Sequence, residues 1–306
     1  MQHWFLSFNR LFRNSTNRLG LTLLATIYSC NVLALDAGDF HQVKSSHEMG
    51  DMSSSQPPKF DRITGMDDFI TRMPVPNVNV RGIGIFVYDG MFSQDALAPL
   101  QVFKSAGLNV FLIAKQKGSV TTSSGLIIVV DKSIDEVNEL DVLLIPGGAL
   151  ATAMQTIDQE SLDWIKKIDA ASLYTTSVCT GAWILGATGL LQGRKASTHW
   201  YRAEEMLTKF GATYTGKCWT TDGKYWTSAG VTGSTDMALA LVNHWFGKQY
   251  TQAVMLDMEY DPKPPVQGGT PEKTNKTIAQ LMQEMYDFFL LPFVNCTPGT
   301  PGACLF

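Results

Sequence analysis

The sequence predicts an α/β domain with a mostly parallel central sheet that is flanked by helices. Apolar runs such as "DVLLIPGG" do not alternate with polar residues, which is typical of strands buried on both faces. Most of these runs are followed by a segment with helical spacing, so strand and helix alternate along the chain. This alternation favours a parallel sheet with crossover helices over an all-helical or all-β fold.

The folded domain is expected to span residues 78–290, and each element has its own signal. Continuous apolar runs predict strands over 80–90, 108–118, 124–137, 139–149 and 172–178. Apolar residues at helical spacing predict helices over 93–107, 158–171, 196–211, 234–247 and 277–290, with another beginning at Gly181. Gly107 is expected near the C-terminal end of the first helix and Asp158 as the N-cap of the second, while 213–230 resembles a strand pair.

Residues 1–34 are interpreted as an export signal. Arg10, Arg13 and Arg18 precede the apolar run "LGLTLLATIYSCNVLA", and Val32-Leu33-Ala34 suits a signal peptidase. The run is shorter than the ~20 apolar residues that span a bilayer. We therefore expect a secreted or periplasmic protein without a membrane span after cleavage; a retained anchor and a lipoprotein attached at Cys30 are the alternatives.

Composition excludes several other classes of protein. The formal net charge of the 306 residues is -4 and no basic run occurs, which argues against nucleic-acid binding. Residues 35–77 are polar and rich in Ser, Asp and Pro, which is typical of a linker or arm. In the expected tail, 291–306, Cys296 and Cys304 could form a disulfide in an oxidising compartment. The cysteines and histidines lack metal-ligand spacing, so no metal site is predicted.

Cys179 lies where a predicted strand meets a predicted helix, in "SVCTGA". A side chain at such a corner is exposed at the edge of the sheet, and the helix N-terminus would favour its thiolate. This arrangement indicates a cysteine nucleophile, with Gly181 allowing a tight turn. A buried structural cysteine is the alternative, and the two interpretations are equally supported by this segment alone.

Four further residues are candidates for the same site, because ligands of open parallel sheets bind beyond the carboxyl ends of the strands. The backbone N–H groups of Gly147 and Gly148 could bind a developing oxyanion, although a glycine turn is the simpler interpretation. Asp95 begins the first helix and could transfer protons, or could act only as an N-cap. His199 could be a base, but a structural role in the core is favoured.

Four segments together resemble the DJ-1/PfpI superfamily, which has the class I glutamine amidotransferase-like fold. They are "YDGMFSQDALAPLQVF", "DVLLIPGG", "SVCTGAWILGATGLLQGRKASTHW" and "MEYDPKPPVQGGTPEK". The most similar branch contains the isonitrile hydratases and the N-terminal domains of some AraC-type regulators. The resemblance extends from about Gly82 to Lys273 and implies a flavodoxin-like sandwich, usually a homodimer.

The resemblance also implies an activity and its residues. Cys179 matches the nucleophilic cysteine, Thr180 the residue that follows it, Asp95 the acidic residue that hydrogen-bonds the cysteine, and Gly147 and Gly148 the glycine turn. The reaction implied is the hydration of an isonitrile to an N-substituted formamide through a thioimidate on Cys179, without a cofactor. A small molecule is therefore the expected partner.

Departures from the wider superfamily narrow this interpretation. The segment "SAGVTGSTDMALAL" lacks the histidine of an amidotransferase triad, and Thr180 stands where related peptidases have histidine. About thirty residues follow Lys273, too few for a DNA-binding domain. A glyoxalase or small hydrolase resembling DJ-1 is the alternative enzyme, and an oxidant-sensing or ligand-binding member of the fold is the non-catalytic alternative.

Overall fold

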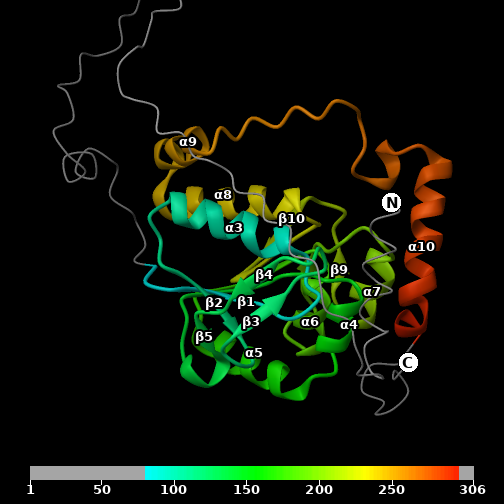
Figure 1. Ribbon diagram of the computed structural model, residues 1–306. Coiled ribbons are helices and arrows are strands. Elements are labelled where there is room, and N and C mark those ends of the chain that lie inside the picture. Colours follow the sequence, from blue (N-terminus) through cyan, green and yellow to red (C-terminus); the bar gives the residue numbers. More distant parts are fainter. Residues whose placement is uncertain (1–79, 296–306) are drawn as a thin grey trace, which may run out of the picture. The chain divides into compact units, whose positions relative to one another are not determined.

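The computed structural model describes residues 80–295, and its centre is a seven-stranded sheet in the order β10-β11-β7-β6-β1-β2-β5 (Figure 1). Its strands are β1 Ile83–Phe86, β2 Val110–Ala114, β5 Lys132–Ser133, β6 Val142–Ile145, β7 Tyr174–Val178, β10 Trp219–Asp222 and β11 Tyr225–Ser228. All pairs are parallel except β10 with β11. The α/β fold with a mostly parallel sheet is confirmed.

Helices cover both faces of this sheet because its central strands are apolar on both sides. Every residue of β1 and β6 is buried. One face carries α3 Ser93–Ser105, α8 Thr232–Phe246 and α9 Lys248–Asp257, and the other carries α4 Leu150–Gln155, α5 Gln159–Ala171 and α6 Gly181–Ala187 (Figure 1). α7 Ala203–Lys209 contacts α6, and α10 Lys276–Val294 contacts α4. The sheet is thus the middle layer of a three-layer sandwich.

The strand order reverses between β1 and β6, and this reversal locates the expected ligand crevice. From β1 the chain continues to β2 on one side, whereas β6 and β7 lie on the other. In register, Ile85 of β1 pairs with Leu112 of β2 and with Leu144 of β6. Segments that follow β1, β6 and β7 therefore meet at one edge, where open sheets of this kind bind ligands.

Several predicted elements differ from the observed ones. The strand expected over 124–137 is divided: β4 Ile127–Val129 pairs only with β3 Ser119–Thr121, and β5 alone joins the main sheet. The helix expected over 196–211 is confined to α7, and α9 was not predicted. Short strands β8 Lys195–Ala196 and β9 Thr213–Tyr214 form a further pair, and two 3-10 turns cover Ile134–Glu136 and Pro271–Lys273.

The observed ends of the helices test the predicted capping residues and the predicted end of the domain. Gly107 follows the C-cap of α3 with a φ of 71°, as a terminating glycine should. Asp158 stands at the N-cap of α5, but its carboxylate bonds Ser161 Oγ and Lys115 Nζ instead of helix N–H groups. Asn275 caps α10 through Thr277 N and Ile278 N. α10 continues to Val294, beyond the domain end expected at 290.

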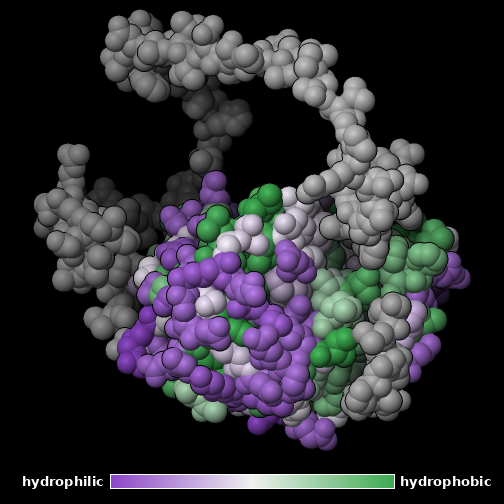
Figure 2. All heavy atoms as spheres, turned by 60° about the horizontal axis from the view of Figure 1, so that its bottom comes forward, coloured by the Kyte–Doolittle hydropathy of each residue, from purple (hydrophilic) through white to green (hydrophobic). Residues whose placement is uncertain are grey.

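Other predictions concern residues outside the described range. The export signal 1–34, the arm 35–77, the domain start at 78 and the pair Cys296 and Cys304 all lie there and stay predictions. Within residues 80–295, no helix is long and apolar enough to cross a membrane. Figure 2 shows one face as mainly hydrophilic, with hydrophobic residues gathered toward the side where α4 and α10 lie. Met154, Leu281 and Phe288 are exposed hydrophobic residues of these two helices.

Candidate active site

Cys179 occupies the turn between β7 and α6 in a strained backbone conformation. Its φ is 58°, a value that residues with a Cβ rarely adopt. Three hydrogen bonds hold this turn: Cys179 N–H donates to Ser228 O at 3.0 Å and to Ala229 O at 3.3 Å, and Thr198 Oγ1 donates to Cys179 O at 2.8 Å. The predicted strand-to-helix corner is therefore present and held from two neighbouring segments.

Two glycines allow the turn to pack against the end of β6. A Cβ added at Gly181 would lie 2.2 Å from Ile145 O, a distance too short for any side-chain carbon. A Cβ at Gly147 would lie 2.7 Å from Thr180 N and 2.8 Å from Cys179 Cβ. The close approach of the two turns therefore requires glycine at both positions.

Asp95 reaches the same place from the other side of the strand reversal. It is the third residue of α3, fully buried, and Oδ2 accepts a hydrogen bond from Gly147 N–H at 3.1 Å. The N-cap of α3 is Phe92, so the interpretation of Asp95 as an N-cap is wrong. Oδ1 is buried without a hydrogen-bond partner of normal geometry among the described residues. The carboxylate also interacts with the Cys179 thiol and the Val231 N–H.

Burial controls the electrostatics of Asp95 and Cys179. It raises the pKa of Asp95 to about 7, against the opposing effect of the Cys179 thiol and the N–H groups of Gly147 and Val231. Burial, followed by the charge of Asp95, raises the pKa of the Cys179 thiol well above its ordinary value, while Thr180 N–H opposes this rise. The thiolate expected from the helix N-terminus is thus disfavoured in the resting site, because Cys179 is only 2% exposed.

Thr180 holds the glycine turn through its side chain. Its Oγ1 accepts hydrogen bonds from Gly148 N–H at 3.1 Å and Ala149 N–H at 3.2 Å, and lies 2.8 Å from Thr152 Oγ1. Thr152 Oγ1 lies 3.0 Å from the Tyr88 hydroxyl, which donates to Pro146 O. Since Tyr88 uses its proton on Pro146, Thr152 donates to Tyr88 and Thr180 donates to Thr152. Thr180 also interacts with the Cys179 thiol through its N–H and its side chain, so it both holds the glycine turn and contacts the candidate nucleophile.

The glycine pair does not have the role expected of it. Gly147 N–H donates to Asp95 and Gly148 N–H donates to Thr180, so neither group is free to bind an oxyanion. The prediction of an oxyanion site at Gly147 and Gly148 is corrected accordingly: both glycines hold side chains of the site. The backbone N–H that faces the sulfur belongs to Thr180.

His199 lies near the cysteine, but its environment makes it a weak base. Its Nδ1 accepts a hydrogen bond from Tyr201 N–H at 3.3 Å. Burial lowers the pKa of His199 to about 4, so the ring is neutral at neutral pH. The favoured structural role agrees with this geometry.

Sequence patterns did not identify two neighbours of the site. The N–H of Val231, at the start of α8, faces Asp95, and Tyr286 of α10 lies close enough that Cys179 and Asp95 help to raise its pKa to about 12, after burial. Tyr286 is far from Cys179 in the chain, and no local motif links the two. A resemblance limited to residues before 274 could not include it.

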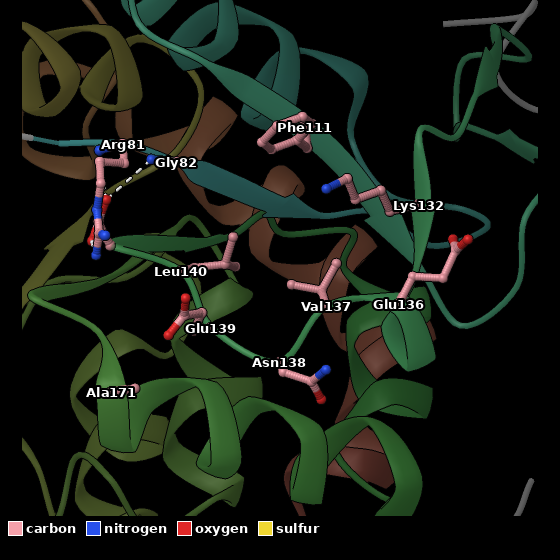
Figure 3. A pocket seen from close by; sticks show the side chains of 11 residues that line it. Arg81, Gly82, Phe111, Lys132, Glu136, Val137, Asn138, Glu139, Leu140 and Ala171 are labelled. Carbon is pink, nitrogen blue, oxygen red and sulfur yellow. Dashed lines mark hydrogen bonds and ion pairs between the residues drawn. The ribbon is translucent and has the colours of Figure 1, made fainter.

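A cavity of about 480 Å³ lies elsewhere in the domain (Figure 3). Its lining includes Gly82 and Asp141, which precede β1 and β6, and Lys132 of β5. These positions mark the amino ends of parallel strands, whereas Cys179 follows the carboxyl end of β7. The cavity is therefore not part of the candidate active site. Across residues 80–295, no group of three or more His, Cys, Asp or Glu side chains is arranged to hold a metal ion.

Comparisons with known proteins agree with this architecture. The pattern of the DJ-1/PfpI family matches residues 81–244. An isonitrile hydratase from Pseudomonas putida is 36% identical over 191 residues, which cover 62% of this chain and 83% of that protein. A deglycase, TK1284, from Thermococcus kodakarensis is 31% identical over 112 residues, 36% of this chain and 67% of that protein. The crystal structure of a THiJ/PfpI family protein from Pseudomonas syringae matches with a TM-score of 0.71 and 32% identity, covering 79% of this chain and 99% of that one.

Proposed function

This chain belongs to the DJ-1/PfpI family, and from that premise we propose that it hydrates isonitriles to N-substituted formamides, with Cys179 as the nucleophile. The observation that carries the proposal is the buried pair of Cys179 and Asp95. An aspartate with a pKa of about 7 beside a thiol can accept and return a proton near neutral pH. The similarity to an isonitrile hydratase supports the same activity.

The first half of the proposed reaction adds the S–H group across the isonitrile carbon. Asp95 takes the proton from the Cys179 thiol, and the sulfur attacks the terminal carbon of R–N≡C to form the C–S bond. Asp95 then gives the proton to that carbon, which yields the thioimidate Cys179–S–CH=N–R. One proton moves from sulfur to carbon, so a single buried acid-base group is sufficient and no second charge is created.

The second half releases the product by adding water. Asp95 accepts a proton from the water whose oxygen attacks the thioimidate carbon, and the nitrogen is protonated. The tetrahedral adduct Cys179–S–CH(OH)–NH–R then breaks its C–S bond as the hydroxyl loses its proton and the sulfur regains one. The net change is R–N≡C plus H₂O to R–NH–CHO, which requires no cofactor.

The alternatives receive less support from the site. An oxidant-sensing cysteine is usually accessible and has a lowered thiol pKa, whereas Cys179 is buried with a raised one. A Cys-His peptidase needs a basic imidazole, and His199 has a pKa of about 4 with Nδ1 already bonded. A glyoxalase or small hydrolase remains the competing enzyme, as the similarity to a deglycase suggests.

The test is to incubate the purified protein with cyclohexyl isonitrile and to follow N-cyclohexylformamide by NMR. We expect turnover by the wild type, no turnover by Cys179→Ala, and a loss of at least about 100-fold in Asp95→Asn, the size typical of a lost acid-base group. Cys218→Ala is the matched control, because Cys218 is the other free cysteine among residues 80–295 and is exposed. Absence of formamide with the wild type, together with conversion of methylglyoxal, would favour the competing enzyme.

A further inference from the structure

Three aromatic side chains form a continuous wall beside the candidate nucleophile. The aromatic wall consists of His199, Trp200 and Tyr286. The ring centroids of His199 and Tyr286 are 5.1 Å apart, those of His199 and Trp200 5.4 Å, and those of Trp200 and Tyr286 5.6 Å. The wall therefore joins the segment before α7 to α10, which Figure 1 shows on the same side of the domain.

The absence of a side chain at Gly230 leaves space between the wall and the sulfur. A Cβ built at Gly230 would lie 3.7 Å from Cys179 Sγ and 3.5 Å from His199 Cδ2, both ordinary contact distances. One carbon-sized space thus touches both the sulfur and the ring edge of His199. A small group that reaches Sγ from this side also contacts the wall.

The wall is uncharged at neutral pH. Burial lowers the pKa of His199 to about 4 and raises that of Tyr286 to about 12. On the adjoining segments, Arg202 is paired with Asp287, since Arg202 Nε donates to Asp287 Oδ1 at 2.8 Å. Tyr286 contacts His199, Trp200 and Tyr201 through its ring. Such a surface favours an apolar group over an ion.

We propose that the aromatic wall receives the N-substituent of the substrate, so that the protein selects isonitriles with aromatic or bulky apolar substituents over methyl or charged ones. This inference rests on the proposed function for the identity of the reacting group. An isonitrile is linear and the sulfur attacks its carbon at an angle, so a substituent R begins roughly 5 Å from Sγ when the carbon is about 3.3 Å away. The contacts of the Gly230 position place the His199 ring edge within roughly 7 Å of Sγ.

Steady-state kinetics test this selection directly. For the wild type we expect kcat/KM for benzyl isonitrile to exceed that for methyl isonitrile and for isocyanoacetate by at least about 10-fold, since an aromatic contact and its burial contribute about that much. Tyr286→Ala should lower kcat/KM for benzyl isonitrile about 10-fold and change the value for methyl isonitrile by less than about 2-fold. Tyr286→Phe should keep the preference, because the ring remains.

Phe288→Ala is the matched control, because Phe288 is on the same helix, 81% exposed, and outside the wall. It should leave both kcat/KM values unchanged. Equal kcat/KM values for benzyl and methyl isonitrile in the wild type, or an equal loss for both in Tyr286→Ala, would overturn the selection while the hydration of isonitriles stands. Loss of the preference in Tyr286→Phe would also overturn it, because the hydroxyl and not the ring would then be responsible.

A binding measurement keeps this inference separate from the proposed function. Calorimetry of Cys179→Ala with N-benzylformamide and N-methylformamide requires no turnover and no change in the wall. If N-benzylformamide binds at least about 10-fold more tightly than N-methylformamide, the apolar subsite is supported, even if the wild type converts no isonitrile. A lack of isonitrile conversion would count against the proposed function alone. Equal binding of the two compounds contradicts the subsite.

Discussion

At the scale of single residues, Cys179 and Asp95 form one titrating unit. Each is buried; the Cys179 thiol favours the ionised form of Asp95, whereas charged Asp95 disfavours the thiolate, so the protons of the pair are lost in two coupled steps. Between the two steps the pair holds one proton. In the proposed reaction, this singly protonated form is the one that moves a proton from sulfur to the isonitrile carbon.

This shared proton predicts the pH dependence of the activity. Below pH 7 the pair gains a second proton on Asp95, and no group is left to accept the thiol proton; kcat/KM should therefore rise with pH around an apparent pKa near 7. The second step belongs to the thiol, whose pKa is raised well above its ordinary value, so no decline is expected over the range measured. Rates of formamide formation between pH 5 and 8.5 give this profile. A profile that is flat, or that falls as pH rises, contradicts the shared proton.

At the scale of elements, the site depends on how closely the turns after β6 and β7 approach one another. Asp95 enters from α3, Gly147 follows β6, and Cys179 and Gly181 follow β7. The parallel pairing of β6 with β7 brings the ends of these strands to the same edge. Residues far apart in sequence thus meet because of the strand order, and the glycines allow the final approach.

Gly181→Ala tests this approach. The added Cβ would lie 2.2 Å from Ile145 O and 2.8 Å from Pro146 O, and backbone at the end of a buried strand moves little. We expect a loss of about 2–3 kcal/mol in the free energy of unfolding, typical of overpacking, together with loss of activity. Gly82→Ala is the control, since its Cβ would lie 3.8 Å from Phe111 Cε2. Urea denaturation measures both variants, and equal stability of Gly181→Ala and wild type would argue against the close approach.

At the scale of the whole molecule, the buried Asp95 couples stability to pH. Its pKa is raised from 3.8 to about 7 on folding, so between these values the folded state binds more protons than the unfolded state. The contribution of this group is therefore fully present below pH 3.8 and is lost as the pH rises toward 7. The protein retains a destabilising carboxylate at neutral pH because the proposed reaction requires it.

Asp95→Asn should remove this coupling. The amide oxygen can still accept the Gly147 hydrogen bond, and no charge is buried, so the variant should be more stable than the wild type above pH 7 by on the order of 2–4 kcal/mol. Near pH 4 the two proteins should be about equally stable, since Asp95 is then protonated when folded. Urea denaturation at pH 4, 5, 6, 7 and 8 gives the difference. A difference that does not change with pH contradicts the raised pKa of Asp95.

Much of the fold was predictable because its signals are local. The buried strands β1, β6 and β7 show continuous apolar runs, and α5 and α8 show helical spacing. The alternation of such strands and helices along the chain predicts the parallel sheet. β4 and β5 were not separated, because one apolar run contains both and only pairing distinguishes them. The helix expected over 196–211 was too long, because its first residues, including His199 and Trp200, have a tertiary role before α7 begins.

The sequence by itself determined the α/β fold, the corner at Cys179 and the candidacy of Asp95, since each of these follows from residue types and their spacing. Only the tertiary structure decided what those residues can do. Burial reversed the expected shift in the pKa of Cys179, because desolvation by the packed core outweighs the short helix that follows it. In the folded protein, the N–H groups of Gly147 and Gly148 donate to side chains of the site, and Tyr286 lies beside it. These long-range contacts depend on strand order and helix packing, which leave no pattern in the local sequence.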